Sequence, residues 1–109
     1  MQKYAVMTHT IEAAAGITRH RFVDLSGAHA TAGGNAFGVS TTDAPIGEQL
    51  AVDCLGSSIV EASGAISKGG EIEVGANGVA VAASAGTVVA RALQDAADGD
   101  LIEVFIIPN

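Results

Sequence analysis

Aromatic residues are scarce in this chain of 109 residues, which has no tryptophan, one tyrosine and three phenylalanines. Apolar residues nevertheless make up 49% of the sequence, and many of them are alanine. A domain of this size buries roughly 60–70% of the surface of its unfolded chain, and small side chains add little area to that core. We therefore expect one domain with a modest core that is completed by burial against other chains. An alanine-rich β domain that is stable alone is the alternative.

Charged residues are also few, at 16% of the chain against a usual share of about 25%. Lysine occurs only as Lys3 and Lys68, a depletion that is typical of protein interfaces. The net charge of −7 is uneven, because residues 1–23 carry three basic residues against one acid while the remainder is strongly acidic. This balance excludes nucleic acid as a partner, since phosphate neutralisation needs a basic face. The cluster 19–21 either meets an acidic protein surface or is solvated on a strand.

Reactive side chains are too few or too dispersed to predict a disulfide, a metal site or a catalytic site. A single cysteine, Cys54, excludes an intramolecular disulfide, and its place on the apolar face of a strand predicts a buried, inert thiol. His9, His20 and His29 match no metal-ligand spacing. A Gly-x-Ser-x-Gly nucleophile motif is missing too. We expect no metal, no cofactor and no enzymatic activity.

Long hydrophobic runs are absent as well. Residues 1–4 are not followed by the apolar segment of a signal peptide, and no run approaches the length of a membrane span. The sequence thus predicts synthesis in a cytoplasm and no membrane partner.

What the chain has is a ladder of short apolar segments between Gly34 and Asn109, separated by glycine-rich turns. Strands of about 4–8 residues with turn signals every 8–12 residues predict an all-β sandwich or barrel. We expect a small barrel or sandwich of about 7–8 short strands, with at most one short helical turn near residues 93–98. The expected strands are residues 37–39, 50–62, 71–74, 79–82, 87–93 and 101–107.

Particular residues refine this ladder. Asn77-Gly78 is a strong hairpin signal that joins residues 71–74 to residues 79–82. Gly56 interrupts the longest run and indicates a bulge or corner. Glu71 and Glu73 alternate with an apolar residue, which indicates an ordinary solvated face.

The two ends of the chain read differently. Residues 101–107 are apolar at nearly every position, so we expect burial on both faces apart from Glu103. Residues 17–25 form a strand with no cleanly apolar face, which suits an edge or an interface. Residues 1–10 form an extended strand or an arm.

Three segments together resemble a known family. They are FGVSTTDAPIG (residues 37–47), VEASGAISKGG (residues 60–70) and ARALQDAADGD (residues 90–100), followed by the terminal apolar strand. The pattern, over about residues 34–109, resembles the small capsid decoration, or cement, proteins of tailed bacteriophages. The resemblance implies a β-barrel-like domain that docks on the outside of the expanded capsid, often as a trimer at local three-fold positions, and clamps neighbouring shell subunits.

From the residues and this resemblance we predict a non-enzymatic structural protein on the outer surface of the virion. Its partners are the major capsid protein and further copies of itself, as a homotrimer. Residues 1–33 are expected to be an N-terminal arm or edge segment beside a barrel of residues 34–109. The candidate interface residues are Tyr4, Arg19, Arg21 and Phe22.

Two other functions remain open from the sequence. Lys68 lies in a turn between apolar segments, which is how carrier domains present a lipoyl or biotinyl group, although Gly-Gly follows it here. A small hydrolase would need an apolar pocket lined by His20 or His29 beside an acid.

Overall fold

The computed structural model describes residue 3 and residues 5–107, and in this part of the chain it has eight β-strands and one 3₁₀ turn. In chain order these are β1 (Ala5–Glu12), β2 (Phe22–Val23), β3 (Gly38–Ser40), β4 (Gln49–Glu61), β5 (Glu71–Val74), the turn η1 (Ala76–Gly78), β6 (Ala80–Ala82), β7 (Ala90–Ala92) and β8 (Leu101–Ile106).

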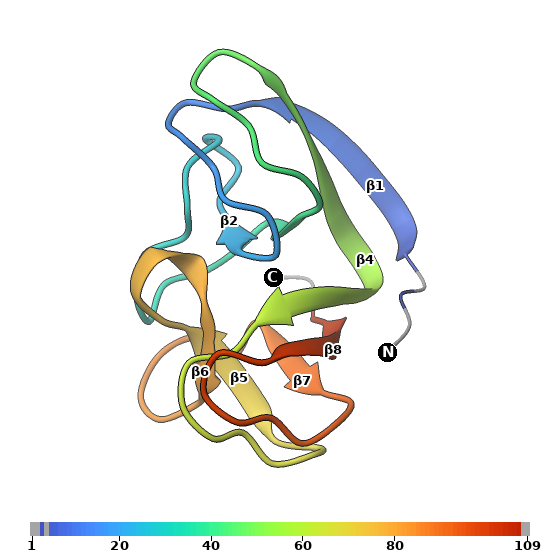
Figure 1. Cartoon of the computed structure of the whole chain (residues 1–109), viewed down its shortest axis with the longest axis vertical. Coiled ribbons are helices and arrows are strands. Elements are labelled where there is room, and N and C mark those ends of the chain that lie inside the picture. The colour runs from blue at the N-terminus through green and yellow to red at the C-terminus, as the bar shows by residue number, and fades with distance from the viewer. Residues whose placement is uncertain (1–2, 4, 108–109) are drawn as a thin grey trace.

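The strands form one sheet that curls into a nearly closed barrel (Figure 1). Neighbours follow the order β2-β3-β4-β8-β7-β5-β6, every ladder is antiparallel, and β1 pairs with β4 outside this path. A parallel bridge between Ala62 and Ala80 brings the end of β4 next to β6. The predicted all-β barrel is therefore confirmed, as is the hairpin that pairs β5 with β6 across Asn77-Gly78.

Strand β4 is the longest element and joins the two halves of the molecule (Figure 1). Its first part pairs with β1 and β3, and its last five residues pair with β8. Gly56 lies at this change of partner with a φ of 94°, a conformation that glycine adopts without steric cost. The register against β1 shifts between Ala5 and Met7. The corner that the sequence predicts at Gly56 is thus confirmed.

Two apolar clusters fill the molecule. The larger lies among β3, the end of β4 and β5 to β8, and the smaller is formed by Ala13, Ile17, Val23, Ala44, Leu50 and Val52. Neighbouring strand residues point to opposite faces, so Phe22 enters the larger cluster while Val23 enters the smaller one. Strand β2 therefore lies between the two cores, and it is shorter than the strand expected over residues 17–25. His20, with a φ of 62°, interrupts that segment.

The sequence allows at most one short helical turn near residues 93–98, and no helical turn forms there. Ala96 instead forms a β-bridge with Ile66, and each N–H donates to the other's carbonyl. The carboxylates of Asp95 and Asp98 accept backbone N–H groups of Lys68 and Gly64, which ties this segment to the neighbouring turn. A segment this short also cannot recover the cost of starting a helix. The one helical turn in the described chain is η1.

Two burial expectations were wrong. Glu73, expected on a solvated face, is buried because the loop after β6 covers it, and its carboxylate accepts the Ser84 hydroxyl at 3.0 Å and the Gly86 N–H at 2.5 Å. Burial alternates along β8, which was expected to be buried on both faces. Ile102, Val104 and Ile106 are buried, whereas Leu101 and Phe105 are exposed. One face of β8 therefore lies open.

Residues from the first third of the chain contribute to both cores. Phe22 and Ala30 belong to the larger cluster, and β1 lies along β4 with almost all of its side chains exposed. A division of the chain at residue 33 remains a prediction.

Candidate docking surface

Four apolar side chains gather on the outward side of three adjacent strands. We call this surface the β8 face and define it as Ile59, Leu93, Leu101 and Phe105. Phe105 is 50% exposed and Leu101 is 40% exposed. Ile59 lies opposite Glu103 in the ladder between β4 and β8, and the Leu93 N–H donates to the Glu103 carbonyl at 3.0 Å. Paired residues share one side of a sheet, so the four apolar side chains lie around Glu103 on one surface.

An open groove of about 380 Å³ adjoins this face. We call it the Arg19 groove; Thr18, Arg19, His20, Asp43, Glu61, Gly99 and Leu101 line it. Leu101 belongs to both surfaces, so the groove and the β8 face are continuous. Arg19 is exposed, and its backbone N–H donates to the Asp43 carboxylate at 2.8 Å. Its guanidinium is thus displayed at the edge of an apolar surface.

Of the three predicted interface residues that the structure describes, Arg19 is the one that is exposed. Arg21 is half-buried, and its guanidinium donates to the Asn77 carbonyl and the Glu61 carboxylate, both at 3.2 Å. Its Nε is buried without a hydrogen-bond partner in the described chain. Phe22 is 1% exposed and packs in the larger core. Tyr4 lies outside the described residues.

His20 fixes the segment that carries both arginines. Its N–H donates to the Ser40 carbonyl, its carbonyl accepts the Glu61 N–H, and its Nδ1 lies 3.3 Å from the Ile59 carbonyl. These contacts hold a left-handed backbone conformation that is uncommon for a residue other than glycine. The side chains of Arg19 and Arg21 therefore leave the chain on either side of a fixed corner.

The imidazole ring of His29 holds the same segment at Thr18. Its Nε2 accepts the Thr18 N–H at 3.1 Å. Burial lowers the pKa of His29 below its ordinary value of 6.5, and the positive charge of Arg21 lowers it further. The ring therefore favours its neutral form, which is the form that can accept this hydrogen bond.

A buried carboxylate anchors β1 to the barrel. Asp53 on β4 is 1% exposed, and it accepts the hydroxyls of Thr8 at 3.0 Å and Ser58 at 2.8 Å. Lys3 pairs with the same carboxylate at 3.1 Å. Because the charge has three partners, burial is tolerated, and the cluster holds Lys3 and β1 against β4.

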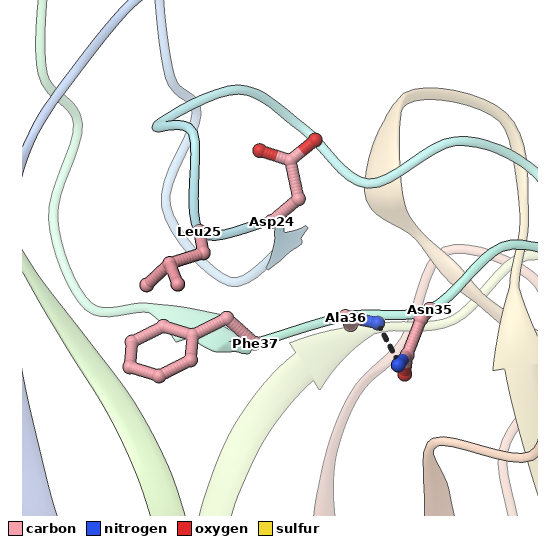
Figure 2. Close-up of a pocket in the computed structure, with 5 residues that line it drawn as sticks. All are labelled: Asp24, Leu25, Asn35, Ala36 and Phe37. Carbon is pink, nitrogen blue, oxygen red and sulfur yellow. Dashed lines mark hydrogen bonds between the residues drawn. The ribbon is translucent and has the colours of Figure 1, made fainter. Parts of the chain in front are cut away.

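A shallow apolar hollow of about 200 Å³ lies on another part of the surface (Figure 2). Leu25 and Phe37 form its apolar side, and its polar groups are engaged locally. Asp24 accepts hydrogen bonds from Ser26 and Ala28, and Asn35 accepts the Ala36 N–H at 2.9 Å. The hollow thus offers no convergent set of reactive groups.

The remaining chemical candidates stay isolated. Burial raises the pKa of the Cys54 thiol, and the neighbouring Asp53 charge raises it further, so the thiolate is disfavoured. Lys68 is exposed in its turn, with its backbone N–H bound to Asp95. Across the described part of the chain, His, Cys, Asp and Glu form no group of three suited to a metal ion. No helix there has the length and apolar character to span a membrane.

Sequence reasoning pointed to the N-terminal third for the interface and missed the β8 face. The signal was present in the sequence, because residues 101–107 are apolar at nearly every position. We interpreted that pattern as burial on both faces within the chain. The structure covers only one of those faces.

Comparison with known proteins finds similarity both to a protein family and to solved structures. A family model described as phage cement protein matches residues 1–106, so the likeness extends beyond the region of residues 34–109 and includes the first third of the chain. Among solved structures, the chain is similar to the N base of the head fiber gp8.5 of bacteriophage phi29, with a TM-score of 0.77, 22% identity and 93% of each chain covered. At that identity the likeness shows the shared fold. No curated protein matches the chain.

Proposed function

Since this chain belongs to the phage cement protein family, we propose that it binds the outer surface of the expanded phage head and stabilises contacts between major capsid subunits. The observation that carries the proposal is the family match across residues 1–106. The protein acts by contact, without a chemical step. It is made in the host cytoplasm and becomes part of the virion.

The surface of the molecule supports a role in contact. The β8 face leaves Leu93, Leu101 and Phe105 between 40% and 50% exposed, and exposed apolar side chains that gather in one place often mark a contact surface. Binding only to the expanded shell stabilises that shell by mass action. Many copies on one closed lattice multiply the effect of a modest contact.

We also propose that the protein assembles as a homotrimer at local three-fold positions, and that Arg19 contributes to a contact with the shell or a sister copy. Arg19 is the predicted interface residue with an exposed side chain in the described chain, and the groove beside it joins the β8 face. Arg21 supports the same contact indirectly, because its bonds to Glu61 and Asn77 hold this segment against the barrel.

The direct test is binding to expanded heads prepared without this protein. Wild-type protein is mixed with such heads, the heads are pelleted, and bound copies are counted by quantitative mass spectrometry. We expect saturable binding at a fixed number of copies per head, and a raised temperature of head disruption. Binding without saturation, or no binding, would contradict the proposal.

Arg19→Ala tests the role of the groove in the same assay. Removal of a charge at the edge of an interface mainly slows association and makes binding less sensitive to salt, with a loss of roughly two- to tenfold in affinity. Arg19→Lys keeps the positive charge at this position and serves as the matched control. Equal binding by the two variants would remove Arg19 from the interface.

A further inference from the structure

Strand β8 carries apolar side chains on both of its faces, but the described chain covers only one. Ile102, Val104 and Ile106 point into the larger core, while Leu101 and Phe105 point outward. A strand that is apolar on both faces is typical of strands buried on both faces. The exposed side of β8 therefore has the composition of a surface that becomes covered.

The neighbours of β8 extend this surface. Phe105 lies between Ser57 of β4 and Arg91 of β7 in the two ladders, and Leu101 lies opposite Glu61. The other large exposed apolar residues are dispersed: Leu25 borders the hollow of Figure 2, Ile46 lies in a turn, and Val6 and Met7 lie at the irregular start of β1. The β8 face is thus where exposed apolar side chains from several strands meet.

Acidic side chains surround the β8 face. Glu71 lies opposite Arg91, Glu103 lies opposite Ile59, and the turn between Leu93 and Leu101 contributes three aspartates. The rim consists of the carboxylates Glu61, Glu71, Asp95, Asp98 and Asp100 and the cations Arg19, Lys68 and Arg91, and the Glu103 carboxylate lies within the face. The excess of carboxylates makes this rim negative.

We propose that the β8 face is the surface that docks on the capsid shell, against an apolar patch of the shell protein that is bordered by lysine or arginine. This inference rests on the proposed function. The charge of the rim selects the partner, because two copies packed face to face would bring the same acids together, and the chain as a whole carries a net charge of −7. Contacts between copies of this protein therefore use another surface.

The first experiment compares two exposed apolar positions with undecorated expanded heads as the probe. Phe105→Ser removes the largest apolar side chain of the β8 face, and we expect at least a tenfold loss of affinity. Ile46→Ser is the matched control, because Ile46 is 71% exposed and lies in a turn outside the β8 face. We expect it to bind within about twofold of wild type.

Leu93→Ser, at a second position of the face, keeps the test valid if Phe105→Ser fails to fold. Folding of each variant is checked by thermal unfolding before binding is measured. Full binding by a folded Phe105→Ser or Leu93→Ser protein would overturn the proposal, as would loss of binding in Ile46→Ser. After either of these results, the proposed function would still hold as long as the wild-type protein binds to the heads. Failure of the wild type to bind would defeat both.

The second experiment tests the charge of the partner. Asp95→Asn/Asp98→Asn removes two rim charges but keeps the side-chain oxygens that accept the N–H groups of Lys68 and Gly64. We expect weaker binding to heads, by about threefold or more at low salt, and a shallower dependence on salt. Unchanged or tighter binding would rule out a basic rim on the partner.

Sedimentation in the absence of heads distinguishes the two possible occupants. We expect Phe105→Ser to retain the self-association of the wild type. If Phe105→Ser instead dissociates assemblies that the wild type forms, the β8 face lies between copies of this protein, and the proposal is wrong.

Discussion

At the scale of single residues, the polar side chains that matter most join the first third of the chain to the barrel. Asp53 gathers Lys3, Thr8 and Ser58 beneath β1, and Arg21 links its own segment to Glu61 and to η1. Asp53 and Ser58 are buried and Arg21 is half-buried, where hydrogen bonds are stronger and unmade ones cost more than in water. They therefore contribute to stability more than surface charges do.

Asp53→Ala should lower the free energy of unfolding by about 1–3 kcal/mol, because the buried hydroxyl of Ser58 loses its acceptor and Lys3 loses its pair. Urea unfolding measures the change. Glu48→Ala, at an exposed turn position, is the control and should stay within about 0.5 kcal/mol of wild type. Equal stability of the two variants would mean that the Asp53 cluster does not hold β1 in solution.

His29 should make stability fall in mild acid. Its pKa is lowered in the folded protein, by burial first and by Arg21 second, so the unfolded chain binds the proton more readily. Stability is therefore complete above the ordinary pKa of 6.5 and declines as the pH falls below it. His29→Gln keeps a hydrogen-bond acceptor but does not titrate.

Melting temperatures at about pH 7.5 and about pH 5.5 provide the measurement for His29. We expect the wild type to lose more stability than His29→Gln over this interval. A loss of the same size in both proteins would assign the acid sensitivity to other groups.

At the scale of elements, β1 is the least embedded strand. Nearly all of its side chains are exposed, and it pairs with β4 alone. It has neither the lysine nor the proline that often protects an open edge. Among the strands of the described chain, β1 is therefore the one that can most readily leave its own β4 and pair with β4 of another copy in an assembly.

A disulfide tests whether β1 stays on its own barrel. Thr10 lies opposite Ala51 in the ladder, and opposed residues of antiparallel strands have Cα atoms about 4.5–5.5 Å apart, which a disulfide spans. Thr10→Cys/Ala51→Cys in a Cys54→Ser background should oxidise within one chain and migrate as a monomer. Linked dimers or trimers would show that β1 pairs with another copy. Thr10→Cys alone is the control.

The sequence predicted the elements best where the signals were local. Asn77-Gly78 placed the β5–β6 hairpin, and Gly56 placed the corner in β4, because each depends on the backbone freedom of one or two residues. The burial of Glu73 was not predictable in this way. It depends on the loop that contains Ser84 and Gly86 folding back over β5, which no local pattern specifies.

At the scale of the whole molecule, the sequence indicated the class of function but not the surface that performs it. Few lysines, a modest core and the family resemblance all pointed to a protein completed by its neighbours. The position of the surface depends on which side of β8 the larger core occupies, and the long-range pairing of β4, β7 and β8 decides this. Phe105 was therefore expected inside and is half exposed.

The central claim is that this protein lies on the outside of the phage head with the β8 face against the shell. Electron cryomicroscopy of expanded heads saturated with the protein tests this claim most directly. We expect density for the barrel on the outer surface, oriented with Leu101 and Phe105 toward major capsid subunits. Heads that carry no added density, or barrels whose β8 face points to solvent, would contradict the account.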